Sequence, residues 1–222
     1  MIVTYLSHAL SRNTPSYGNR DRVVFDPKSS VADGDTSNTT DFRLTNNHIG
    51  THLDVPNHFY DKGSTITDIS PEEWFFFNVC LLEIPCEEGR LMDVTDFKSA
   101  QIETDIDLLL IKTGFELLRN KDVYWNAYPG ISEGACEFLR KHLKNLRAVG
   151  FDFISLTSPL FKEQGKKAHL SLLNEKEDRP IFIIEDMKLS TLMSNPDQVI
   201  VAPLLLDKGN GGPVTVLSIS ET

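Results

Sequence analysis

Three of the six histidines in this chain lie between positions 48 and 58, and an aspartate stands among them. The segment reads HIGTHLDVPNH, so that His48, His52, Asp54 and His58 all occupy even positions. In an extended segment, residues two apart project to the same side, and these four polar side chains could therefore converge. A helix would pair His48 with His52 but turn Asp54 away, and the glycine and proline of the segment disfavour a helix.

Imidazole and carboxylate side chains at this density favour a metal site. Two imidazoles and one carboxylate form the kind of set that holds Zn, Mn or Fe and leaves positions open for water. A single histidine in such a stretch is more often an ordinary surface or core residue. Three histidines and an aspartate on one side of one segment, however, favour metal ligands over ordinary surface or core residues.

The complete motif, from His48 to His58, resembles the HxGTHxDxPxH signature of the cyclase-like metal-dependent hydrolases. That family includes bacterial kynurenine formamidase (arylformamidase) and isatin hydrolase. Further short segments of the chain stand in the family's order: Leu6-Ser7-His8, Lys112-Thr113-Gly114, Gly150-Phe151-Asp152 and Gly211-Gly212-Pro213-Val214. The resemblance implies a single domain over residues 1–222 with the swivelling β/β/α-like fold of the family.

The resemblance also implies a second metal-binding segment, in which a histidine is followed by a glutamate at the end of a strand. His169 and Glu185 fit that description, although the polar insertion NEKEDRP at 174–180 separates them more widely than is usual in the family. The implied arrangement has His48, His52 and Asp54 on a first metal. Asp54 and Glu185 would bridge to a second metal, which His169 completes. The expected cofactor is Zn²⁺, as one or two ions, with Mn²⁺ as the alternative.

Three further residues receive roles by the same resemblance or by their position. His58 stands beyond the ligand set and is similar to the family's proton shuttle. Tyr17 falls where kynurenine formamidases usually carry a substrate-stacking tryptophan, and it is the candidate substrate-binding residue. His8, which follows the opening strand, could also face the site.

The implied activity is hydrolysis of a carbon–nitrogen amide bond by a metal-activated water. Its most specific form is an arylformamidase that releases formate from N-formyl-kynurenine. One alternative keeps the chemistry and opens a cyclic amide such as isatin, or a lactone. An alternative of another class is a non-catalytic metal-binding protein. The resemblance further implies a homodimer or a homotetramer.

The elements that must position these residues are mostly short strands. Strands are predicted at Ile2–Leu6, Arg22–Phe25, Val79–Ile84, Leu108–Lys112, Ala148–Phe153, Ile181–Glu185, Val199–Ala202 and Val214–Ile219. The polar stretch Asp26–Asp41 is predicted as a loop between two strands. Two helix starts are predicted, at Ser70 from the sequence SPEE and at Ser132, whose helix should run to about Leu146. We therefore expect an α/β domain with a mixed β-sheet core and flanking helices.

Composition excludes several other classes of protein. The 222 residues carry a net charge of −10, and that excess of acid argues against nucleic acid as a partner. Cys80, Cys86 and Cys136 form neither a disulfide framework nor a thiolate zinc motif. We see no secretory signal and no long apolar run, so the expectation is a cytoplasmic protein that acts on a small-molecule amide, away from membranes.

Overall fold

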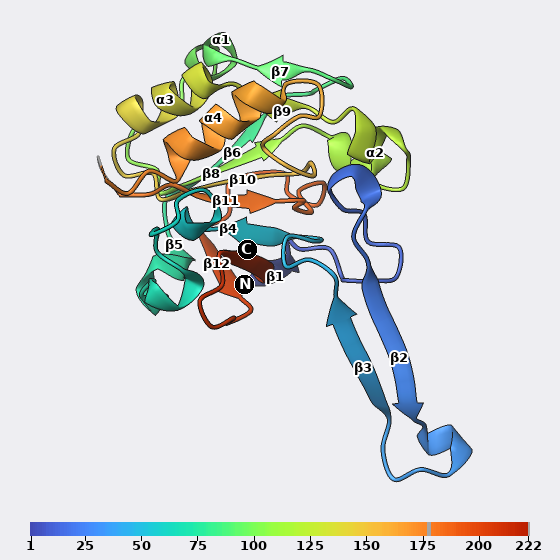
Figure 1. Cartoon of the computed structure of the whole chain (residues 1–222). Coiled ribbons are helices and arrows are strands. Elements are labelled where there is room, and N and C mark those ends of the chain that lie inside the picture. Colours follow the sequence, from blue (N-terminus) through green and yellow to red (C-terminus); the bar gives the residue numbers. More distant parts are fainter. Residues whose placement is uncertain (177–178, 222) are drawn as a thin grey trace.

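Within residues 1–176 and 179–221, which the computed structural model describes, nine strands form one mixed sheet (Figure 1). The order is β5–β12–β13–β4–β11–β10–β8–β6, and β1 pairs with β13. The bounds are β1 Ile2–Tyr5, β4 His52–Asp54, β5 Phe75–Phe76, β6 Val79–Glu83, β8 Leu108–Lys112, β10 Ala148–Phe151, β11 Phe182–Glu185, β12 Gln198–Pro203 and β13 Gly211–Ser220.

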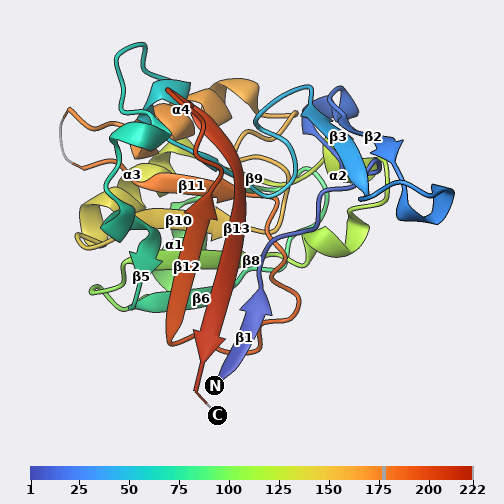
Figure 2. The ribbon, with the colours of Figure 1, turned by 90° about the horizontal axis from the view of Figure 1, so that it is seen from below.

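The sheet changes from parallel to antiparallel pairing at β11. Strands β6, β8, β10 and β11 pair in parallel. All the pairings from β11 through β4 to β13, β12 and β5 are antiparallel. Figure 2 shows β12 and β13 crossing over the parallel strands, so the two halves of the sheet form two layers.

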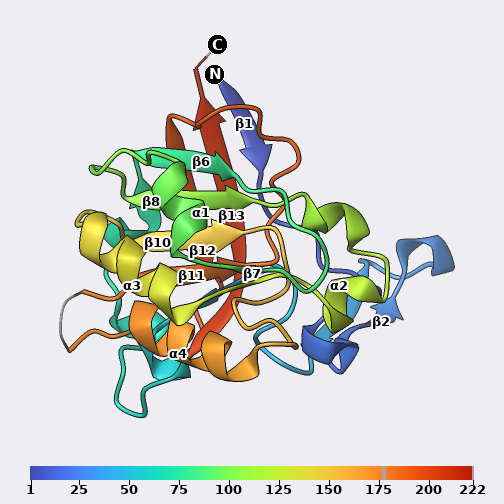
Figure 3. The same cartoon turned by 90° about the horizontal axis from the view of Figure 1, so that it is seen from above.

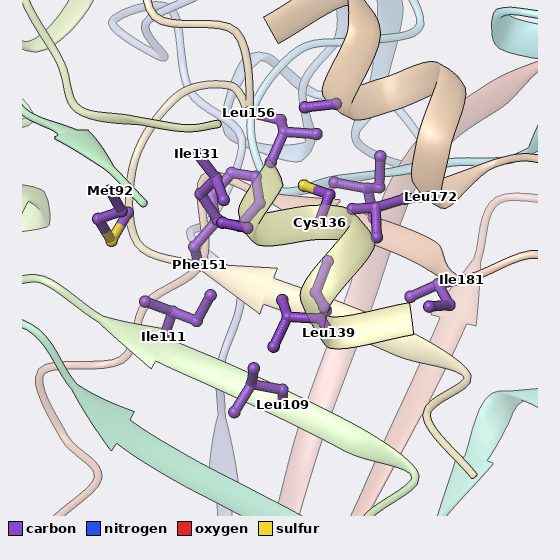
Figure 4. Close-up of a cluster of buried hydrophobic side chains, with 14 of the residues drawn as sticks. Met92, Leu109, Ile111, Ile131, Cys136, Leu139, Phe151, Leu156, Leu172 and Ile181 are labelled. Atoms are coloured by element: carbon purple, nitrogen blue, oxygen red, sulfur yellow. The ribbon is translucent and has the colours of Figure 1, made fainter. Parts of the chain in front are cut away.

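Side chains on opposite faces of the parallel strands build two separate cores. Leu109 and Ile111 face the helices α3 (Glu133–His142) and α4 (Lys162–Leu172), and they pack with Leu139 and Leu172 (Figures 3 and 4). Leu108 and Leu110 face the other way and pack with valines of β12 and β13. This alternation is the period of two that a strand buried on both faces requires. The predicted mixed-sheet α/β fold with flanking helices is confirmed.

A hairpin extends from the body of the protein, where a loop was predicted. Strand β2 (Val23–Ser29) pairs with β3 (Thr39–Leu44), and Asp26 lies opposite Asp41. The prediction of a loop over Asp26–Asp41 is therefore wrong at both ends. Its polar residues can occupy strands because the hairpin projects into solvent (Figure 1), and neither face needs to be apolar.

Helix predictions succeed at Ser132 and fail at Ser70. The Ser132 hydroxyl caps α3 by accepting from the Ala135 amide at 3.2 Å, although the helix ends at His142 rather than near Leu146. After Ser70 there is only the 3₁₀ turn Pro71–Trp74, because the chain enters β5 at once and pairs with β12. Among the described residues, the other α-helices are α1 (Val94–Ser99) and α2 (Val123–Asn126). A second two-stranded sheet, besides β2–β3, joins β7 (Leu91–Met92) to β9 (Gly130–Ile131).

Across the described residues, no helix combines the length and the apolar character that crossing a bilayer requires.

Candidate metal centre

Strand register brings the first three candidate ligands to one face of the sheet. His52 on β4 lies directly opposite Glu185 on β11, and residues two apart on a strand share a face, so Asp54 joins them. Leu53, between them, points to the other side and is fully buried. His52, Asp54 and Glu185 each offer a ligand atom, and these atoms all lie within 4.8 Å of one another.

A backbone hydrogen bond fixes the orientation of His52. Its Nδ1–H donates to the carbonyl of Gly50 at 2.9 Å. Gly50 has φ +69°, in the left-handed region that glycine adopts at little cost. The Nε2 atom of His52 then points inward, 3.2 Å from Oε2 of Glu185 and 3.6 Å from Oδ1 of Asp54.

The fourth candidate ligand, His169, lies on a helix that we did not predict. His169 lies on α4, and its Nδ1–H donates to the Gly165 carbonyl one turn earlier, at 2.8 Å. Its Nε2 lies 3.5 Å from Oδ2 of Asp54 and 3.5 Å from Oε1 of Glu185. His52 and His169 thus share one design, since both rings donate from Nδ1 to backbone and offer Nε2 to the two carboxylates. Histidine ligands in metal sites are oriented in this way.

His48 and His58 approach Asp54 from the remaining side. His48 Nδ1 lies 2.7 Å from Oδ1 of Asp54, and its Nε2 lies 3.1 Å from Oδ1 of Asn210. The His58 ring stacks on that of His48 at 3.9 Å, and its Nε2 is 4.0 Å from Oδ2 of Asp54. His48 can sit here because Gly211 has no side chain: a Cβ on Gly211 would lie 2.4 Å from the ring of His48.

Asp54 is therefore the hub of the cluster. Ligand atoms of His48, Asp54 and His58 form a second group within 4.8 Å of one another, and Asp54 belongs to both groups. The structure thus places together the motif residues His48, His52, Asp54 and His58 and the two residues implied by the family resemblance, His169 and Glu185. The grouping differs from the prediction in two respects. His52 was assigned to the first metal but lies beside Glu185, a ligand of the second. His58 was placed outside the ligand set but belongs to one of the two groups of possible ligands.

The charges of the cluster are those of a cation site. Burial lowers the pKa of His52, but the hydrogen bond and charge of Glu185 outweigh it and raise that pKa to about 9. Burial is likewise outweighed at His169, where Asp54 and Glu185 raise the pKa to about 10. Against burial, the charges of His58 and His48 hold the pKa of Asp54 well below its usual range. Two buried carboxylates thus retain protons on two neighbouring imidazoles, and a divalent ion could take the place of those protons.

His58 behaves differently from the two buried imidazoles. Burial lowers the pKa of His58 to about 4, and the charge of Asp54 offsets this only in part. Its side chain is 30% exposed, whereas those of His52 and His169 are nearly inaccessible. His58 is consequently neutral near pH 7 and accessible to a molecule entering the site.

The cluster forms the floor of a cavity of about 570 Å³. Tyr17 lies in its wall, half-buried, with its ring edge against Tyr128 at 6.3 Å between centroids. The candidate substrate-binding residue therefore lines the same cavity as the histidine cluster. His8 is not in this wall; it lines a separate cavity beside Ser7 and Thr51, and the expectation that it faces the site is wrong.

Two supporting features escaped the sequence analysis. Asn210, from the chain before β13, contacts His48 and has no motif of its own. Helix α4 does carry a signal, since its buried residues Gly165, Ala168, His169 and Leu172 follow the spacing of one helical face.

The chain is similar in sequence and in structure to several known proteins. The model of a family described as "Putative cyclase" matches residues 4–157. Cyclase-like protein 2 of Arabidopsis thaliana is 23% identical over 221 residues, which cover 96% of this chain and 78% of that protein. A kynurenine formamidase of Bacillus cytotoxicus is 24% identical over 177 residues, covering 77% and 75%. The solved structure of isatin hydrolase A from Ralstonia solanacearum superposes with a TM-score of 0.79 at 21% identity, covering 99% of this chain and 92% of that one, and shows the same fold.

Proposed function

The chain belongs to the cyclase family, and from that premise we propose that it is a metal-dependent hydrolase of amide bonds. The observation that carries this proposal is the convergence of His52, His169 and Glu185 on Asp54. The Nδ1–H groups of His52 and His169 donate to backbone carbonyls, which leaves Nε2 of each ring directed toward the two carboxylates. Histidines that bind metal ions are commonly oriented by such a hydrogen bond from the other ring nitrogen.

The nitrogen and oxygen donors suit Zn²⁺, and they suit Mn²⁺ as the alternative. His52, Asp54, His169 and Glu185 would hold one ion, and His48 with Asp54 would supply donors for a second. A divalent cation there provides Lewis-acid chemistry, acidifying a water and polarising an amide carbonyl.

His58 is the proposed acid–base residue. It is neutral near pH 7, partly exposed on the cavity wall, and 4.0 Å from Asp54. Its Nε2 takes a proton from the attacking water and returns it to the departing amine nitrogen. The stacked ring of His48 fixes the plane of His58 and so the direction of its proton transfer.

The specific substrate that we propose is an aryl formamide such as N-formyl-kynurenine. Kynurenine formamidase is among the relatives of the chain, and Tyr17 offers an aromatic face on the cavity wall. The second candidate is hydrolysis of a cyclic amide such as isatin, favoured by the likeness to isatin hydrolase A.

One experiment separates these candidates from each other and from a non-catalytic metal protein. Metal-depleted protein is assayed with N-formyl-kynurenine and with isatin, before and after the addition of Zn²⁺ or Mn²⁺. We expect turnover of N-formyl-kynurenine that chelator abolishes and metal restores. Turnover of isatin alone would select the second candidate. Stoichiometric metal binding without turnover of any amide or lactone would contradict the proposed activity.

A further inference from the structure

The wall of the active-site cavity is cationic, although the chain as a whole carries a charge of −10. Arg20, Lys162 and Lys166 line the cavity above the histidine cluster. One acidic side chain, Asp21, also lies in that wall, where it accepts hydrogen bonds from the side chains of Thr45 and Asn46. The other acids of the cavity, Asp54 and Glu185, lie at its floor within the cation site. In a protein with this excess of acid, the grouping of three cations around one opening requires an explanation.

Helix α4 brings both lysines and a candidate ligand to one face. Positions 162, 166 and 169 are spaced four and three apart, and such residues lie on the same side of a helix. With a rise of 1.5 Å per residue, Lys166 lies about 4.5 Å and Lys162 about 10.5 Å from His169 along the helix axis. A negative charge bound by these amines would thus lie on the same side of α4 as the candidate metal ligand His169.

Neither lysine side chain is engaged by another described group of the protein. Among the described residues, Lys162 and Lys166 make no ion pair and no side-chain hydrogen bond, and both are exposed. Their neighbour Lys167 differs, because it lines a separate cavity and pairs there with Glu133 at 3.4 Å. Arg20 is held over the ring of Tyr17 at 5.4 Å, which keeps its charge beside the proposed aromatic contact.

We propose that Lys162 and Lys166, supported by Arg20, bind an anionic group of the substrate, so that the enzyme selects amides that carry a carboxylate. This proposal rests on the proposed function, which supplies the amide bond of the substrate. The cationic residues of the cavity wall supply the argument for the carboxylate. The ammonium groups would form charge-assisted hydrogen bonds to the carboxylate, while the ring of the substrate lies against Tyr17.

The test compares two substrates that differ in one group, formanilide and 2-formamidobenzoate. Both have the same aryl formamide, but only the second carries a carboxylate. The variants are Lys162→Gln, Lys166→Gln and their combination, with Lys167→Gln as the matched control of equal charge change on the same helix. Metal content and circular dichroism verify that each variant retains the site and the fold.

We expect the double variant to lose about tenfold to 100-fold in kcat/KM for 2-formamidobenzoate, mainly through KM. Formanilide turnover should remain within twofold, and Lys167→Gln should match the parent with both substrates. Added salt should reduce the preference of the parent for the anionic substrate. Equal kinetics in the parent and the double variant, or an equal loss in Lys167→Gln, would overturn the proposal.

Binding measurements keep the proposal separate from the proposed activity. If metal-loaded parent hydrolyses neither compound, the aryl formamidase assignment fails, but calorimetric titration with 2-formamidobenzoate still tests the cationic wall. Weaker binding to the double variant than to the parent and to Lys167→Gln would support the wall as an anion site. Unchanged affinity would refute it.

Discussion

His52 and Glu185 are cross-strand partners, and their Nε2 and Oε2 atoms lie 3.2 Å apart. They come from strands separated by more than half of the chain, and β11 is the strand at which the sheet changes from parallel pairing with β10 to antiparallel pairing with β4. The candidate metal centre is thus built where the two halves of the fold meet, and its geometry depends on the register of a short strand.

Replacing Glu185 tests its place in the centre. We expect Glu185→Gln to keep the fold but to lower the metal content and the turnover, because the neutral amide offers the cation one weaker donor. Mass spectrometry of the native protein and an amide assay give the two readouts. Glu163→Gln, an exposed change on α4, serves as the control. Parent-like metal content and turnover in Glu185→Gln would leave a one-metal site on the first motif alone.

Replacing His58 separates catalysis from metal binding. His58 is near enough to Asp54 to be a ligand, but its exposure and its low pKa fit a free base. We expect His58→Ala to retain its metal and to lose about 10²–10⁴-fold in turnover, the usual contribution of a positioned acid–base group. If the metal is lost instead, His58 is a ligand and the base must be another residue.

The metal-free protein should lose stability as pH rises above 6.5. The folded pKa values of His52 and His169, about 9 and 10, exceed the usual 6.5, so their protonation stabilises the fold at low pH. That contribution is complete below pH 6.5 and is lost as pH rises through 9 to 10, by up to about 1.4 kcal/mol per pH unit for each ring.

Urea unfolding of chelator-treated protein between pH 6.5 and 8.5 measures this slope. Metal-loaded protein should lack it, because coordination holds the rings neutral. The exposed variant His142→Gln should retain the slope in the metal-free state. A metal-free protein of constant stability over this range would show that the two rings are not proton-loaded.

An ion pair beside the centre should contribute more stability than those on the surface. Arg119 donates to both oxygens of the buried Asp186, at 2.9 and 2.7 Å, and Asp186 directly follows Glu185. Its carbonyl accepts from the Thr51 hydroxyl at 2.6 Å, next to His52. This pair therefore anchors both strands that carry the first candidate ligands.

We expect Arg119→Met to cost about 3–5 kcal/mol in the free energy of unfolding, because the buried carboxylate of Asp186 loses its cationic partner and keeps only the hydrogen bond from Tyr124. Lys28→Met, which breaks an exposed pair with Asp41, should cost at most about 1 kcal/mol. Equal losses in urea denaturation would show that Arg119 does not anchor the site.

The sequence predicted that the motif side chains lie close together, but not the local structure that brings them together. His48, His52, Asp54 and His58 do converge, but the extended segment from which that was argued exists only at His52–Asp54. A turn at Gly50 delivers His48, and the 3₁₀ turn Pro56–His58 delivers His58. Parity along the chain therefore grouped these four side chains by an argument that holds over only three residues.

The remaining contacts depend on long-range packing. Asn210 contacts His48 only because β13 pairs with β4, and no local sequence pattern predicts the register of that pairing. The strand predicted at Arg22–Phe25 was too short, because polar composition predicts a loop beyond it, and exposed strands do not need alternating apolar residues. The start of α3 was predictable, since its cap is a local interaction of Ser132 with Ala135.

Asp54 provides the most direct test of the account, because all four histidines of the cluster come within hydrogen-bonding or ion-pair distance of it. The measurement is the metal content of Asp54→Ala by mass spectrometry, taken on the same sample as its amide turnover and compared with the parent. We predict that metal and turnover are lost together while circular dichroism shows the fold retained. Full metal stoichiometry in Asp54→Ala would contradict the proposed centre.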